Sequence, residues 1–177
     1  MEVTITRDTN LVGEYDKANE SIKNNAVGGR LVDVWKAPDH GFYKITSDAA
    51  FYDGRLVGIG AVTRDSMGEV MVSTCWQQNE IKEVEVGEAN AARHALSIAI
   101  QAGLRSCYDL KKEVIEPTYF GVIISDILAI AKHCQHITYS HVKRGGNVVA
   151  HELAKLASSF VDMRVWIEEV LEQITNF

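Results

Sequence analysis

The chain has 177 residues, 46% of them hydrophobic and 24% charged, so it is long enough for one folded domain with its own core. It has no apolar run of membrane-spanning length and no apolar secretion signal at its start, which argues against a membrane protein or a membrane partner. The net charge of −6 argues against a general nucleic-acid binder, although residues 132–155 are locally basic. Three widely spaced cysteines are typical of reduced thiols and predict an intracellular protein, nuclear or cytoplasmic.

The first part of the chain predicts an appendage followed by a meander of strands. Residues 1–34 have mixed charges and a glycine-containing stretch without periodicity, which indicates an N-terminal appendage. From residue 42 the pattern becomes regular, and alternation predicts strands over 42–49, 55–65 and 69–77. Turn-forming residues at 65–68 predict a hairpin between the second and third strands. These three strands are therefore expected to be antiparallel.

The second part alternates helices with strands. Ala89, Ala92, Leu96 and Ala99 share one helical face, and Gly103 lies where a helix C-cap belongs. The remaining elements are expected at 84–102 (helix), 104–108 (strand), 122–134 (helix), 136–142 (strand) and in a last helix with Asn147 as N-cap. This order predicts an α/β fold with a mixed sheet and helices on its faces, over residues 35–166, followed by an acidic tail at 167–177.

One aspartate does not fit the pattern of its strand. The stretch YKITSDAAF alternates like a half-buried strand up to Ser47, and then places Asp48 where a β-branched or apolar residue is expected. Aspartate is depleted in strands, so this position needs a reason. Three more polar residues stand at the edges of predicted elements: Glu88, Asp109 and His151.

Several motifs resemble one known family. YKITSDAAF, GIGAVTRDSMGEV, VEVGEANAARHAL and HVKRGGNVVAHELAKLA occur in this order. Together they resemble the ribonuclease H-like domain of plant reverse-transcriptase-type proteins, which are type 1 ribonucleases H, over roughly residues 35–166. The resemblance implies a five-stranded mixed sheet flanked by helices. It also implies an endonuclease, a hydrolase that cleaves the RNA strand of RNA–DNA hybrids.

The same resemblance assigns roles to the four polar residues. By motif match, Asp48, Glu88, Asp109 and His151 take the catalytic positions, and the three carboxylates among them are the metal ligands. Two carboxylates about 4 Å apart repel by roughly 4 kcal/mol at an effective dielectric near 20, so their convergence requires cations. Two Mg²⁺ ions, with Mn²⁺ as the alternative, would activate a water and stabilise the leaving oxygen. His151 suits proton handling on the product side better than Mg²⁺ ligation.

Contacts to the hybrid are expected next to these positions. Lys143, Arg144 and Asn147 precede the last helix and are candidates for contacts to the phosphate backbone. The hydroxyl groups of Thr46 and Ser47 are further candidates. The expected partner is therefore nucleic acid, whereas the sequence does not identify a protein partner.

Two alternatives to an active nuclease stay open. The segment before Asp109 is roughly three residues shorter than the resemblance implies, and an odd loss turns a strand side chain to the other face. Asp109 is then displaced, or Glu113 stands in for it. The runner-up is an inactive ribonuclease H-like domain that binds nucleic acid or a protein, and the third alternative is a purely structural module. A zinc site at His133, Cys134 and His136 is disfavoured because a fourth ligand is missing.

Overall fold

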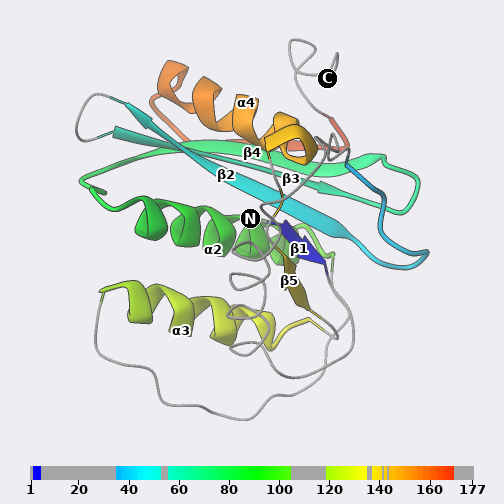
Figure 1. The fold of residues 1–177 in the computed structure, drawn as a ribbon. Helices are drawn as coiled ribbons and strands as arrows, with labels where there is room; N and C mark the ends of the chain where they lie inside the picture. Colours follow the sequence, from blue (N-terminus) through cyan, green and yellow to red (C-terminus); the bar gives the residue numbers. More distant parts are fainter. Residues whose placement is uncertain are drawn as a thin grey trace, which may run out of the picture.

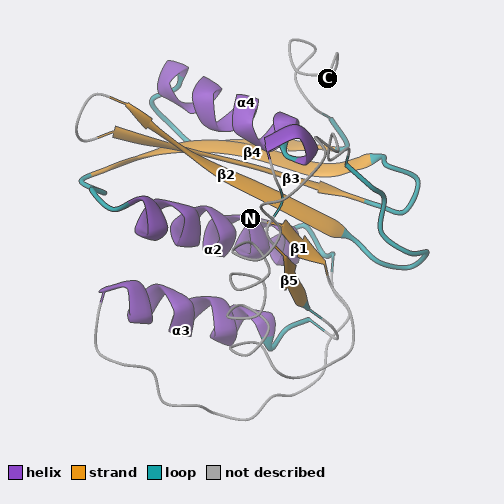
Figure 2. Cartoon of the chain, in the orientation of Figure 1, coloured by secondary structure: helices purple, strands orange, loops and turns teal. Residues whose placement is uncertain are grey.

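The structure, a computed structural model, describes residues 2–4, 35–52, 56–104, 119–134, 137–140, 142 and 144–169. Helices lie on both faces of one sheet (Figures 1 and 2). The elements are β1 (Glu2–Thr4), β2 (Lys44–Tyr52), β3 (Leu56–Arg64), β4 (Val70–Asn79), α2 (Val84–Gln101), α3 (Tyr119–Ala131), β5 (Thr138–Ser140), α4 (Val148–Leu156) and β6 (Arg164–Ile167), with short 3₁₀ turns at Arg144–Gly146 and Ala157–Ser159.

The strands form a six-stranded sheet in the order β5-β1-β2-β3-β4-β6. The predicted meander is present, because β2, β3 and β4 pair as antiparallel neighbours, and the Asp65 carboxylate accepts main-chain N–H groups within the predicted hairpin turn. Every strand pair in the described residues is antiparallel, yet β2 and β5 run in the same direction because each is antiparallel to β1. The strand expected at 104–108 falls almost entirely outside the described residues.

Two short strands were not expected from the sequence. β1 comes from the predicted appendage and lies between β2 and β5, while β6 lies at the other end of the sheet. The sheet thus includes residues outside the region 35–166, because β1 precedes this region and β6 extends to Ile167. The division of the chain at residues 34 and 166 stays a prediction. Within the described part of the chain, no helix has the length and apolar character needed to cross a membrane.

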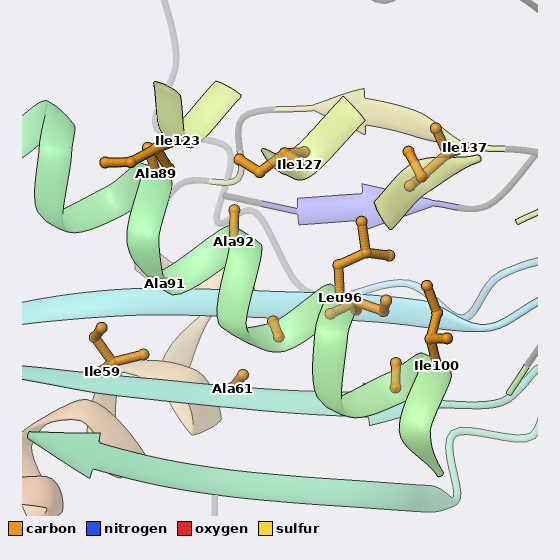
Figure 3. Packing of buried hydrophobic residues seen from close by; sticks show 14 of the residues in the cluster. Ile59, Ala61, Ala89, Ala91, Ala92, Leu96, Ile100, Ile123, Ile127 and Ile137 are labelled. Atoms are coloured by element: carbon orange, nitrogen blue, oxygen red, sulfur yellow. The ribbon is translucent and has the colours of Figure 1, made fainter. Parts of the chain in front are cut away.

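The larger core lies between the sheet, α2 and α3 (Figure 3). In this view Ile123 and Ile127 of α3 lie beside Ala89 and Ala92 of α2, and Ile59 of β3 lies on the other side of α2. Alanines on both sides of α2 keep the helix thin, so the sheet and α3 both approach it closely. The predicted alanine face of α2 is confirmed, since all four of its residues are buried.

The helix ends agree only partly with the sequence patterns. Gly103 has a φ of +82° and follows α2, as expected for a residue in the C-terminal cap. α3 begins at Tyr119, three residues before the predicted start at 122. Asn147 holds the N-cap position of α4, but its side chain makes no capping hydrogen bond, so the predicted capping role is wrong.

Two glycines of β3 set the position of α4 on the other face of the sheet. A Cβ atom at Gly58 would overlap main-chain atoms of Ala154, and one at Gly60 would overlap main-chain atoms of Ala150 and Ala154. The backbone of α4 therefore rests directly on β3. Gly60 also pairs with Asp48 of β2, so this close approach brings α4 over the aspartate that did not fit its strand.

We predict that Gly60→Ala lowers the free energy of unfolding by about 1–3 kcal/mol, because main-chain atoms of α4 cannot move aside as a flexible side chain can. Chemical denaturation measures the change. Val122→Ala, at a side chain of α3 that is 54% exposed, is the control and should shift stability little. Equal stability of Gly60→Ala and the wild type would contradict the direct contact of α4 with β3.

Candidate active site

Asp48 lies near the middle of β2 and faces α4. Alternate residues of a strand face the same side, and the Tyr52 hydroxyl, four residues on, donates to the Lys155 carbonyl oxygen near the end of α4. The Asp48 Oδ2 atom lies 2.5 Å from His151 Nδ1, and both side chains are largely buried, with 21% and 15% exposed. Because an ionised carboxylate only accepts hydrogen bonds, Nδ1 carries the hydrogen.

Glu88 reaches the same place from the opposite face of the sheet. It lies in the second turn of α2, directly after Gly87. A Cβ atom at Gly87 would lie 2.6 Å from the Phe51 ring, so α2 lies against β2 at this point. The Glu88 carboxylate accepts a hydrogen bond from the main-chain N–H of Ala49, the residue after Asp48. Two carboxylates that are distant in sequence thus meet at β2.

Side chains of the site bond main-chain groups of β2 on both sides of Asp48. Within the described residues, β1 pairs with β2 from Lys44 to Thr46. Farther along β2, Asn147 Nδ2 donates to the Ser47 carbonyl oxygen at 2.9 Å, and the N–H of Ala49 donates to Glu88. These two hydrogen bonds connect α4 and α2 to the strand that carries Asp48.

The surroundings of Glu88, which include the nearby Asp48 carboxylate, oppose its ionisation. Burial raises the pKa of Glu88 above its ordinary value, and the negative charge of Asp48 raises it further. The hydrogen bond from Ala49 and the nearby His151 lower this pKa, but they do not offset the rise. Crowding of the two carboxylates is therefore a cost that a bound cation would relieve.

Asn147 has a different role from the ones expected. It is only 5% exposed, and besides Ser47 its Nδ2 reaches Asp48 Oδ1 at 3.4 Å. Its Oδ1 is buried and finds no hydrogen-bond partner among the described residues. The asparagine thus ties α4 to β2 and orients Asp48, which pattern reasoning missed because an asparagine before a helix also matches an N-cap.

The other expected contacts to nucleic acid differ in accessibility. Thr46 and Ser47 are buried, with 2% and 1% exposed, so their hydroxyl groups do not contribute to an accessible surface. Arg144 is exposed in the 3₁₀ turn just before α4. Lys143, Asp109 and Glu113 lie outside the described residues.

The donor set at this site fits a hard divalent cation in part. Carboxylate oxygens are the ligands that Mg²⁺ prefers, and Asp48 and Glu88 supply them from two rigid elements. In the ranges that the structure describes, no group of three histidine, cysteine, aspartate or glutamate side chains is arranged to hold a metal ion. A third carboxylate would have to come from the rest of the chain.

A shallow depression elsewhere on the molecule is separate from this site. It has a volume of about 340 Å³ and is lined by Trp76, Arg93, His94, Ser97, Asp126 and Ile130. Burial is the main cause that lowers the pKa of His94 to about 4, and the positive charge of Arg93 is the second cause. The His94 ring is therefore neutral near pH 7. Asp48, Glu88 and His151 do not line the depression.

Comparison with known proteins identifies the fold. The chain resembles the N-terminal RNase H domain of Rv2228c from Mycobacterium tuberculosis, solved as a fusion with maltose-binding protein, with a TM-score of 0.52 and 20% identity over 65% of this chain and 91% of that one. It also resembles RNase H1 from the halophilic archaeon Halobacterium salinarum NRC-1, with a TM-score of 0.54 and 16% identity over 65% of this chain and 96% of that one. This is a ribonuclease H-like α/β fold, as predicted.

A match of the sequence to a family profile agrees with the fold comparison. Residues 46–108 match the profile of a family described as reverse transcriptase-like, and this segment includes both Asp48 and Glu88. No curated protein sequence matches the chain. The resemblance to ribonuclease H-like domains of reverse-transcriptase type is thereby confirmed, whereas a plant origin is not addressed by these matches.

We predict that Glu88→Gln stabilises the fold near pH 7, raising the Tm by about 2–4 °C, the shift that roughly 1 kcal/mol produces in a domain of this size. A raised pKa means that the unfolded state loses the Glu88 proton first as the pH rises, so ionisation favours unfolding. The advantage of the variant should therefore disappear below about pH 4, where the carboxyl is protonated in both states.

Thermal unfolding between about pH 3 and pH 8 measures this effect. Glu85→Gln is the matched control, because Glu85 is an exposed glutamate in the first turn of the same helix. A Glu88→Gln variant with a lower Tm than the wild type at pH 7 would show that the ionised Glu88 carboxylate does not destabilise the fold.

Proposed function

We propose that this protein is a metal-dependent endonuclease that hydrolyses the RNA strand of RNA–DNA hybrids. The observation that carries the proposal is the meeting of Asp48 and Glu88 at β2, although Asp48 lies on this strand and Glu88 lies on a helix that packs on the sheet. A ribonuclease H-like fold and a reverse transcriptase-like sequence match support the same chemistry. Carboxylates crowded in this way are disfavoured unless cations share them.

Each residue of the site has a distinct task in this proposal. Asp48 and Glu88 would hold Mg²⁺, and Asp109 remains the candidate for the third carboxylate. A pair of divalent ions bound there would supply activation of a water and stabilisation of the leaving oxygen. Asn147 and His151 fix the Asp48 carboxylate through its two oxygens. With Nδ1 engaged, Nε2 of His151 is the ring nitrogen left to take up or release a proton.

The nucleic-acid surface is proposed to begin at the N-terminal end of α4. Arg144 is exposed there, three residues before Asn147, and Lys143 precedes it in the sequence. Phosphate contacts from these cations would orient the hybrid, while contacts to 2′-hydroxyl groups would distinguish its RNA strand. A local basic site of this kind is compatible with the acidic net charge of the whole chain.

A second candidate function is nucleic-acid binding without cleavage. It is favoured by the hydrogen bond at Asp48, because His151 holds one of the two oxygens that a cation would need. The described residues also supply only two of the three expected carboxylates. In this alternative the same surface binds the hybrid or a protein, and the fold is retained without turnover.

Asp48→Asn tests the proposed activity. The variant keeps the shape of the side chain but loses its charge, so we expect Mg²⁺-dependent cleavage of a labelled RNA–DNA hybrid to fall by on the order of 10³-fold or more. Asp162→Asn, the same change at an exposed aspartate that is not part of the site, should cleave like the wild type. Comparable cleavage by both variants would refute the assignment of Asp48.

Two further readouts separate the alternatives. Mg²⁺ should raise the Tm of the wild type but not that of Asp48→Asn, because only the native site would bind the ion in the folded state. A wild type that binds the hybrid in a salt-sensitive manner but does not cleave it supports the binding module. Absence of both cleavage and binding at low salt leaves only a structural role.

A further inference from the structure

Two cationic side chains lie side by side at the beginning of β2, and the candidate active site does not include them. Lys44 is the first residue of β2 and pairs with Arg64, the last residue of β3. Like charges directly opposite each other on neighbouring strands are destabilising. Both side chains are also partly buried, which removes part of the water that stabilises their charges. In a chain with a net charge of −6, such a pair indicates a function other than packing.

Both cations lie against one indole ring. The guanidinium carbon of Arg64 lies 4.8 Å, and the ammonium nitrogen of Lys44 5.6 Å, from the centroid of the Trp35 ring. A Cβ atom at Gly68 would lie 3.5 Å from the same ring, so Trp35 is seated on the hairpin between β3 and β4. Trp35 Nε1 is buried and has no hydrogen-bond partner within the described residues. The ring therefore holds two cations close together and adds a third donor without an acceptor.

Arg64 has no carboxylate partner in the part of the chain that the structure describes, because none of the ion pairs found there includes it. One oxygen of the neighbouring Asp65 carboxylate accepts two main-chain N–H groups of the hairpin turn instead. Lys44 donates to the main-chain carbonyl oxygen of Lys36 at 2.9 Å, which leaves its positive charge in place. Burial lowers the pKa of both cations, and the charge of Arg64 lowers that of Lys44 further. An anion bound to both side chains would offset this repulsion.

The pair faces the same side of the sheet as Asp48. Alternate residues of a strand share a face, and Lys44 precedes Asp48 by four residues in β2. α4 reaches this face only from Ser47 onwards, where the Asn147 side chain bonds the main chain, and it runs beside the later part of β2 towards Tyr52 (Figure 1). The beginning of β2 therefore extends past the N-terminal end of α4, about 13 Å from Asp48 at roughly 3.3 Å per residue.

We propose that Lys44 and Arg64 bind a phosphate group, supplied by the backbone of the RNA–DNA hybrid at a distance from the cleavage position. The planar fork of arginine matches two oxygens of a phosphate, and lysine adds a second positive charge. Phosphates of one strand rise by about 3.4 Å per base pair, so a hybrid that follows β2 would present a group roughly four base pairs from the bond over Asp48. The hybrid as the source rests on the proposed function, whereas the affinity for a phosphate oxyanion rests on the two cations.

This contact would add affinity without taking part in the reaction. A phosphate contact carries no sequence information, so its loss should weaken binding to hybrids of different sequence alike. It would also be made equally in the bound substrate and in the transition state. Its loss is therefore expected to raise KM for hybrid cleavage while kcat changes little, in contrast to the loss of turnover expected for Asp48→Asn.

Binding of a labelled RNA–DNA hybrid to the full chain without Mg²⁺, measured by fluorescence anisotropy over a range of salt concentrations, tests the proposal. We expect Arg64→Gln and Lys44→Gln each to bind about three- to tenfold more weakly near 0.1 M salt, and their double variant to reduce the slope of log K against log salt by about 0.9, the contribution of one phosphate. Arg64→Lys keeps the charge and should keep the slope. Lys132→Gln, the same loss of charge at an exposed lysine after α3, is the matched control and should bind like the wild type.

Inorganic phosphate tests the cation pair separately from the hybrid. At constant ionic strength, replacing chloride by phosphate should raise the Tm of the wild type more than that of Arg64→Gln, since exclusion of phosphate from the surface affects both proteins alike. This difference in Tm together with an unchanged salt slope would show that the site takes free phosphate, and would overturn the hybrid as its source.

The outcomes also separate this site from the nuclease. A wild type that cleaves the hybrid, with folded Lys44 and Arg64 variants that bind it unchanged, would overturn the phosphate site and leave the proposed function intact. A wild type that does not cleave but loses salt dependence in the double variant supports the site without the nuclease. Absence of hybrid binding at low salt, with equal phosphate effects on the wild type and Arg64→Gln, would overturn the proposal entirely.

Discussion

The close approach of two helices to β2 is the constraint on which the rest of the structure depends. Gly60 lets the backbone of α4 rest on β3 beside Asp48, and Gly87 lets α2 lie against β2 from the other face. Side chains on these helices then reach one strand edge without long, flexible connections. The site is therefore positioned by main-chain packing, which is more rigid than a loop.

The hydrogen bonds of β2 couple this site to the stability of the fold. Asn147 donates a hydrogen bond to the main-chain carbonyl oxygen of Ser47, and Glu88 accepts one from the main-chain N–H of Ala49. The same two side chains lie next to the Asp48 carboxylate. The groups that hold the Asp48 carboxylate thus also bond the main chain of the sheet, so substitutions of these groups are expected to change the stability of the fold.

The sequence predicted the parts of the fold that have a period or a distinctive residue. The alanine face of α2, the meander and the unusual aspartate in a strand were all readable, and the structure confirms these features. β1 and β6 have only three and four residues, too few to show an alternation. The role of Asn147 could not be predicted from the sequence, because its partner Ser47 is distant along the chain. The two residues meet only when α4 packs on the sheet.

The histidine at position 151 changes the balance of charge in the site. A fourth acidic residue at this position would add to the repulsion that already raises the pKa of Glu88, whereas His151 lowers that pKa and bonds Asp48. The site is consequently less crowded without a cation than a wholly acidic one would be. A cation bound at Asp48 would have to compete with the imidazole for one of its oxygens. The contact between His151 and Asp48 is also the observation that favours nucleic-acid binding without cleavage.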